Sequence, residues 1–218
     1  MTGWLEFAGA YLAFLAAHAV PARPAIRRRL ADLLGERAYI WTHAAVSLVL
    51  LGWLVEAASR APYVALWEPA PWQAHATFTA MAAACLLAAL ALGRPNPFSF
   101  GGGDPARYDP DRAGIVGITR HPLLWAIGLW AAGHLIANGD LAHFLLFGGF
   151  MAMAAGGMVS LDRRARRRLG PDWERLRPRQ RLAWSVQDAW RVLAAVLLFV
   201  CLLLLHPLVI GVDPLSAL

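Results

Sequence analysis

Long apolar segments alternate with short, arginine-rich connections along the 218 residues of this chain. A helix that crosses a bilayer needs about 20 mostly apolar residues, and the sequence offers six candidates. They are Trp4–Val20, Ala38–Ala58, Trp72–Leu92, Ile115–Ala137, Leu141–Leu161 and Val192–Ile210. The fourth is the weakest, because Arg120 and His121 interrupt it. The pattern predicts an all-α fold: one polytopic membrane domain, residues 1–218, that forms a bundle of about six transmembrane helices.

The composition agrees with a membrane protein. Hydrophobic residues make up 59% of the chain and charged residues only 16%, whereas a soluble domain carries about 25% charged residues. The two cysteines, Cys85 and Cys201, both lie in apolar segments and form no Cys-x-x-Cys motif. Zinc ribbons, iron–sulfur clusters and covalently attached c-type haem therefore have no support in this sequence.

The distribution of the arginines predicts the topology. All 20 basic residues are arginine, and 19 of them lie in or beside the connections that follow the first, third and fifth segments. Only Arg60 lies at the other end of the segments. The positive-inside rule then places these connections in the cytoplasm and both termini in the periplasm. The net charge of +6 is explained by basic loops that contact anionic lipid headgroups, so we expect no nucleic-acid partner.

Ionisable side chains at membrane depth are candidate functional residues, because burying them in lipid is costly. His134 follows Pro122 by 12 residues, which is about 18 Å along a helix. Trp130 precedes it by one turn, on the same helix face. An imidazole at that depth needs a partner, such as a side chain, a carbonyl, a water or a metal. Both a structural role and a ligand role are compatible with this position.

The other histidines are harder to interpret. His75, His143 and His206 lie near the predicted outer ends of their segments, where an interfacial position without a special role is expected. The depth of His18 depends on Pro21. If the helix continues through Pro21, His18 lies at a depth similar to that of His134, and two imidazoles at one level suit a six-coordinate haem. If Pro21 ends the helix, His18 is interfacial.

A second polar feature opens the fourth segment. Thr119-Arg120-His121-Pro122 is followed by Trp125, one turn after His121. Arg120 is either an arginine that extends toward the headgroups from an ordinary helix start or a contact for an anion or a cofactor phosphate. We therefore treat Arg120 and His121 as candidate catalytic residues. The fifth helix is expected to extend through the basic residues that follow it, as far as Gly170.

The central segment closely resembles the NnrU family of bacterial inner-membrane proteins. The resemblance rests on Gly114-Ile115-Val116, Thr119-Arg120-His121-Pro122-Leu123-Leu124-Trp125, Leu129-Trp130, His134-Leu135 and Asn138-Gly139-Asp140. It implies a role in denitrification, in the expression or activity of nitrite and nitric oxide reductases. Nitric oxide and a respiratory membrane protein are the implied partners.

The NnrU family is also similar to 15-cis-zeta-carotene isomerase, a membrane haem b enzyme. That similarity implies that His18 and His134 are the axial ligands of a haem b, which makes them the candidate metal ligands. Where the isomerase carries a ligand-switching cysteine, this sequence has Ala131. If the chain is itself an isomerase, its hydrophobic polyene substrate would enter a lipid-open cleft lined by Trp125 and Trp130, which we count as cofactor-binding candidates.

A more distant similarity points to membrane methyltransferases that use S-adenosylmethionine at the cytoplasmic face. The matching residues are Arg120, His121, Pro122, Asp162, Gly170 and Trp173. Those enzymes usually carry glutamate where Asp162 stands, and the basic run Arg163–Arg168 is not typical of them. Three functions thus remain open: a haem b protein of nitrogen-oxide respiration, a haem-dependent isomerase, and a methyltransferase.

Overall fold

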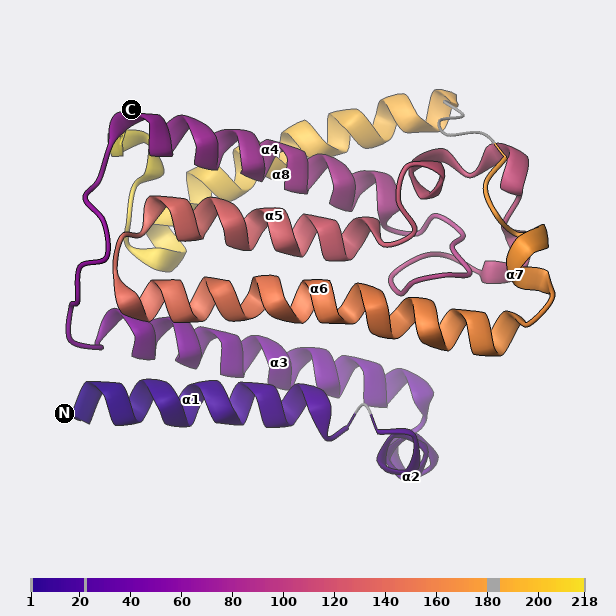
Figure 1. The fold of residues 1–218 in the computed structure, drawn as a ribbon, viewed down its shortest axis with the longest axis horizontal. Coiled ribbons are helices and arrows are strands. Elements are labelled where there is room, and N and C mark those ends of the chain that lie inside the picture. The colour runs from indigo at the N-terminus through magenta and orange to yellow at the C-terminus, as the bar shows by residue number, and fades with distance from the viewer. Residues whose placement is uncertain (1, 22, 180–184, 218) are drawn as a thin grey trace. The chain divides into compact units, whose positions relative to one another are not determined.

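The computed structural model describes residues 2–21, 23–179 and 185–217 (Figure 1). Arg181, one of the predicted cytoplasmic arginines, lies outside these residues. The chain divides into two compact units. Unit 1 comprises Met1–Trp67 and Asp140–Leu146, and unit 2 comprises Glu68–Gly139 and Phe147–Leu218.

Unit 1 is built on a helical hairpin. Its helices are α1 (Thr2–Ala19), α2 (Pro24–Leu34) and α3 (Glu36–Ser59). α1 packs along α3, and the Tyr39 hydroxyl donates a hydrogen bond of 3.2 Å to the carbonyl of Pro21. At the other end of the hairpin, a Cβ on Gly3 would lie 2.6 Å from the carbonyl oxygen of Arg60. The two long helices are therefore antiparallel.

The first helix does not continue through Pro21. α1 ends at Ala19, and α2 starts separately at Pro24. A proline inside a helix lacks the N–H for the helical hydrogen bond, and its ring collides with the carbonyl four residues earlier. The continuous helix that we considered as the way to bring His18 to the depth of His134 is therefore wrong. His18 lies in the last turn of α1.

Unit 2 contains the remaining helices. They are α4 (Pro71–Ala91), α5 (Pro122–Ala137), most of α6 (Leu141–Leu169), α7 (Asp172–Arg175) and α8 (Val186–Ile210). α4 packs against both α5 and α8. Where α4 meets α5, a Cβ on Gly133 would lie 3.2 Å from that of Ala80, and the Thr77 hydroxyl donates to the Gly133 carbonyl over 2.9 Å. Small residues and interhelical hydrogen bonds of this kind let membrane helices approach closely.

The fourth apolar segment begins its helix later than expected. Residues Gly114–Gly117 form a single 3-10 turn, and α5 starts only at Pro122. Gly114 has φ +56°, a left-handed conformation that ends regular helix. His121 has φ −123° and ψ 56°, because a residue before proline is disfavoured in the α region. The predicted start at Ile115 is thus wrong.

The fifth segment extends as expected. α6 continues through the basic residues to Leu169, and Gly170 follows with φ +52°, which is the common end of a helix. The sixth helix begins at Val186, earlier than predicted, because Ser185 and Asp188 form a capping box there.

Four helices are long and apolar enough to cross a membrane by length and composition: α3, α4, α6 and the Asp188–Ile210 part of α8. Among the described residues α5 is a shorter apolar helix, and α1 is not among the four. The apolar helices indicate a multi-pass membrane protein. The six spans and the periplasmic termini stay predictions.

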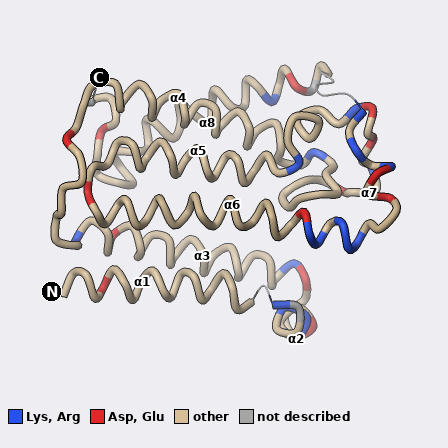
Figure 2. The backbone as a smooth tube through the Cα atoms, viewed as in Figure 1, with Lys and Arg blue, Asp and Glu red and all other residues tan. Residues whose placement is uncertain are grey.

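Each unit carries its arginines mainly at one end (Figure 2). In unit 1 they surround α2 and the start of α3, and Arg60 follows the other end of α3. In unit 2 they surround the ends of α4 and α6 and the starts of α5 and α8. We call these the arginine-rich ends. This polarity within each unit is what the positive-inside rule requires.

Candidate functional site

The connection between α4 and α5 folds onto the arginine-rich end of unit 2. We call residues 93–121 the α4–α5 loop. Phe98 and Tyr108 of this loop are buried, and the ring centroid of Phe98 lies 5.2 Å from that of Trp173 and 5.7 Å from that of Tyr108. Burial, aided by the nearby charge of Asp109, raises the pKa of Tyr108 to about 12. The loop therefore packs into a small apolar core that it shares with Leu90 of α4, Ala165 of α6 and Trp173 of α7.

Polar contacts fix the loop relative to the helices of unit 2. The Arg94 guanidinium forms an ion pair with Asp188 at the start of α8. Arg191 donates to the carbonyls of Ala89 and Leu92, at 2.7 and 2.6 Å. These contacts join the start of α8 to the end of α4.

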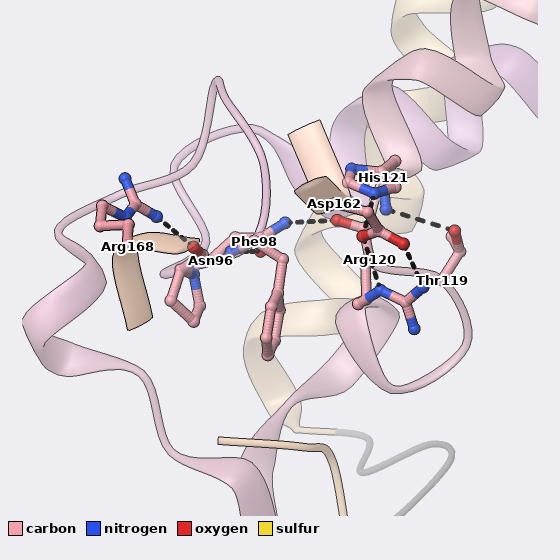
Figure 3. Close-up of polar contacts among 8 residues, drawn as sticks. Asn96, Phe98, Thr119, Arg120, His121, Asp162 and Arg168 are labelled. Carbon is pink, nitrogen blue, oxygen red and sulfur yellow. Dashed lines mark hydrogen bonds and ion pairs between the residues drawn. The ribbon is translucent and has the colours of Figure 1, made fainter. Parts of the chain in front are cut away.

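Asn96 connects the loop to the start of α5 (Figure 3). Its side-chain amide donates to the Arg120 carbonyl over 2.9 Å, and its side-chain oxygen accepts from the Phe98 N–H over 2.9 Å. Arg168 of α6 donates to the carbonyl of Pro97. The backbone carbonyls of Pro97 and Arg120 are thus held in place by side chains.

Arg120, His121, Asp162 and Trp173 meet at this end, and we call them the Arg120 site. Arg120 donates two hydrogen bonds to the Asp162 carboxylate, at 3.0 and 2.6 Å. The His121 Nε2 lies 2.8 Å from the same carboxylate, and the Arg120 guanidinium carbon lies 5.5 Å from the Trp173 ring centroid. The hydrogen bonds to Asp162 raise the pKa of Arg120, so this guanidinium stays charged. Figure 3 shows the side chains of Arg120 and His121 converging on Asp162.

His121 retains one buried atom without a partner. Its Nε2 must donate to the carboxylate, so in the neutral ring Nδ1 carries the lone pair. The residue is only 4% exposed, and Nδ1 has no hydrogen-bond partner among the described residues. A carboxylate that orients an imidazole in this way is the arrangement of a general base. The sequence predicted Arg120 and His121, and it suggested Asp162 and Trp173 only through the methyltransferase similarity.

His134 lies in the last turn of α5 and contacts several aromatic rings. Its Nδ1 donates to the Trp130 carbonyl over 2.9 Å, and its ring centroid is 5.2 Å from that of Trp130 and 5.0 Å from that of Phe147. The expected proximity of Trp130 is confirmed. Trp130 also packs on Phe150, whereas Trp125 is 49% exposed.

A second histidine lies beside His134 in unit 2. The ring of His206, from α8, has its centroid 6.4 Å from that of His134, and the two ring planes differ by 26°. Nδ1 of His206 donates to the Val212 carbonyl over 2.7 Å. The sequence predicts an interfacial position for His206. Its position near the outer end of a predicted span was the available signal, but spacing along the chain cannot show which helices are neighbours.

His18 has its own neighbours in unit 1. Its Nδ1 donates to the Phe14 carbonyl over 3.1 Å, and the two ring centroids are 4.3 Å apart. The ring of His43, from α3, lies 5.7 Å away, with planes at 62°. The structure thus pairs His18 with His43 and His134 with His206.

The fold and the Arg120 site define a helical, multi-pass membrane protein with a structured polar loop at its arginine-rich end. Comparison with protein families gives the particular group: the sequence pattern of the NnrU protein family matches residues 6–214. The chain belongs to the NnrU family. Searches of curated proteins and of solved structures returned no match.

The described residues contain no group of three or more His, Cys, Asp or Glu side chains that could hold a metal ion. Zinc sites use three or four protein ligands, so such a site has no support there. A haem is different, because its macrocycle supplies four nitrogen ligands and the protein supplies only the axial ones. Pairs of imidazoles fit that requirement.

Proposed function

We propose that this NnrU-family protein binds haem b in the bacterial inner membrane, with His134 as an axial ligand, and acts in denitrification. The observation that supports this proposal is the hydrogen bond from His134 Nδ1 to the Trp130 carbonyl, at 2.9 Å. A carbonyl only accepts, so Nδ1 carries the proton and the lone pair is on Nε2. Metal-ligating histidines almost always donate their other ring nitrogen in this way.

His18 shares this feature, since its Nδ1 also donates to the carbonyl four residues earlier. The family resemblance makes it the second axial ligand. The helix bounds weigh against that pairing. His18 lies in the last turn of α1, beside the arginine-rich α2, whereas His134 lies in the last turn of α5, whose first turn follows Arg120. On the predicted topology, His18 is then near the cytoplasmic surface and His134 toward the periplasmic one.

If haem is bound, it would supply one-electron chemistry, and nitric oxide would bind the iron only where one histidine ligand is exchangeable. The residues around His134 are suited to hold such a group away from water. Trp130 contacts Phe147 and Phe150 with ring centroids 5.4 Å apart in both pairs, and these rings give an apolar wall next to the ligand. An apolar wall lowers the polarity around an iron, which is one way in which proteins set its potential.

The test is the absorption spectrum of the protein purified in detergent after haem-replete expression. We expect a Soret band that His134→Ala abolishes. His75→Ala, at an exposed histidine of α4, is the matched control and should keep the band. A colourless wild-type protein would rule out the haem proposal.

The second candidate is a methyltransferase that uses S-adenosylmethionine at the Arg120 site. It is favoured by one observation: Arg120, His121, Asp162 and Trp173 meet there, and His121 Nδ1 is buried without a partner. Calorimetry with S-adenosylmethionine tests it. Binding that Arg120→Ala weakens, while Arg112→Ala at an exposed arginine of the same loop does not, would support this function. Absence of binding, or equal binding in both variants, would exclude it.

A further inference from the structure

We propose that His206 is the second axial imidazole of the haem site at His134, in the position that the family resemblance gives to His18. This inference rests on the proposed haem binding. It concerns two residues of unit 2 that come from different helices, α5 and α8.

The separation of the two rings fits one metal between them. A bond from a metal to an imidazole nitrogen is about 2.0–2.1 Å long. Two imidazoles on opposite sides of one metal therefore have ring centroids roughly 6 Å apart. The centroids of His134 and His206 are 6.4 Å apart. The two rings are near parallel, with planes 26° apart, and ligation requires that both Nε2 atoms turn toward one iron.

The hydrogen bonds of the two rings give both the same tautomer. His134 Nδ1 donates to a carbonyl of its own helix, and His206 Nδ1 donates to the Val212 carbonyl over 2.7 Å. Gly211 ends α8 with φ +84°, a left-handed turn that brings the carbonyl of Val212 back toward His206. Both rings therefore carry the Nε2 lone pair that a metal requires.

The position of the pair in unit 2 supports the same conclusion. α5 begins beside Arg120 and α8 begins beside Arg191, so both helices start at the arginine-rich end. His134 lies in the last turn of α5, and His206 lies four residues before the end of α8 at Ile210. The two imidazoles are thus at the same level of this unit, far from its arginines.

The experiment compares the spectra of four purified variants: His134→Ala, His206→Ala, His18→Ala and the control His75→Ala. We expect wild type, His18→Ala and His75→Ala to give the same low-spin, six-coordinate spectrum. His206→Ala should shift to a high-spin, five-coordinate spectrum, and added imidazole should restore the low-spin form. His134→Ala should lose the haem.

His206→Met separates ligation from folding, because methionine is also an axial ligand. It should stay low-spin with a raised reduction potential, since a Met/His pair raises the potential of haem. A high-spin His18→Ala protein beside an unchanged His206→Ala protein would overturn this inference and leave the proposed haem function intact. A colourless wild-type protein would overturn both.

Discussion

Individual charges at the arginine-rich end of unit 2 are neutralised inside the protein. The side chains of Arg94 and Asp188 are only 13% and 4% exposed, and Asp188 also accepts hydrogen bonds from the Ser185 backbone and hydroxyl. A buried pair of this kind gains little over apolar residues, but removing one partner leaves an uncompensated charge. The pair therefore makes the attachment of the α4–α5 loop sensitive to single substitutions.

We expect Arg94→Ala to destabilise the protein by about 3–5 kcal/mol, because it leaves Asp188 buried without its counter-ion. A thermal melt in detergent would show a lowered Tm. The control is Arg112→Ala, at an exposed position of the same loop, which should change the Tm little. Equal melting of the two variants would contradict the structural role of this ion pair.

Gly114 lies against the Arg94 side chain, and there is no space for a side chain at position 114. It adopts φ +56°, and a Cβ there would lie 1.8 Å from an Arg94 guanidinium nitrogen. Gly114→Ala should cost at least roughly 1–2 kcal/mol for the left-handed backbone alone, plus the displacement of Arg94. In a double-mutant cycle with Arg94→Ala, the two losses should be less than additive. Full additivity would show that the glycine and the arginine act independently.

At the scale of helices, the sequence predicted the presence of each helix more accurately than the residues at which it begins and ends. Each of the six apolar segments contains a helix, because apolar length is a strong signal. The predicted start at Ile115 was wrong because glycine and proline compete with hydropathy there. Proline also decides the alternative that the sequence left open at Pro21, since α1 ends before it. The Arg120 site was predicted in part, since Arg120 and His121 are adjacent in sequence. The proximity of His206 to His134 could not be predicted, because it depends on how α5 and α8 are placed in the fold.

Packing of α5 on α4 depends on the small residue Gly133, whose Cβ would lie 3.2 Å from that of Ala80. Gly133→Val should force these helices apart, at a cost of about 1–3 kcal/mol for overpacking. Gly156→Val in α6 is the control, since a Cβ there meets nothing within 4 Å. Differential scanning in one detergent should show a lower Tm for Gly133→Val only.

At the scale of the whole molecule, large apolar side chains are exposed along the helices, whereas the arginines lie mainly near helix ends. Large exposed side chains such as Leu48, Val49 and Leu208 are 68%, 71% and 82% exposed, as expected for helices whose surroundings are lipid. The arginines gather mainly at one end of each unit. By the positive-inside rule, this distribution predicts that the loops at the arginine-rich ends face the cytoplasm.

Cysteine labelling in cells tests the predicted topology. In a background with Cys85→Ala and Cys201→Ala, Ala106→Cys in the α4–α5 loop should react with a membrane-impermeant maleimide only after lysis. Tyr63→Cys, at a position 71% exposed after α3, should react in spheroplasts. The reverse pattern would invert the predicted orientation.

The length of α6 determines how far the Arg120 site lies from the start of that helix at Leu141. Asp162 follows Leu141 by 21 residues of continuous helix, which is about 30 Å at 1.5 Å per residue and equals the thickness of the hydrocarbon layer. The continuous helix therefore fixes both the distance of the Asp162 carboxylate from the start of α6 and its rotation about the helix axis. Adding one residue between Phe147 and Leu161 would turn Asp162 by about 100° away from Arg120. Insertions and deletions in this part of α6 are therefore expected to disrupt the Arg120 site.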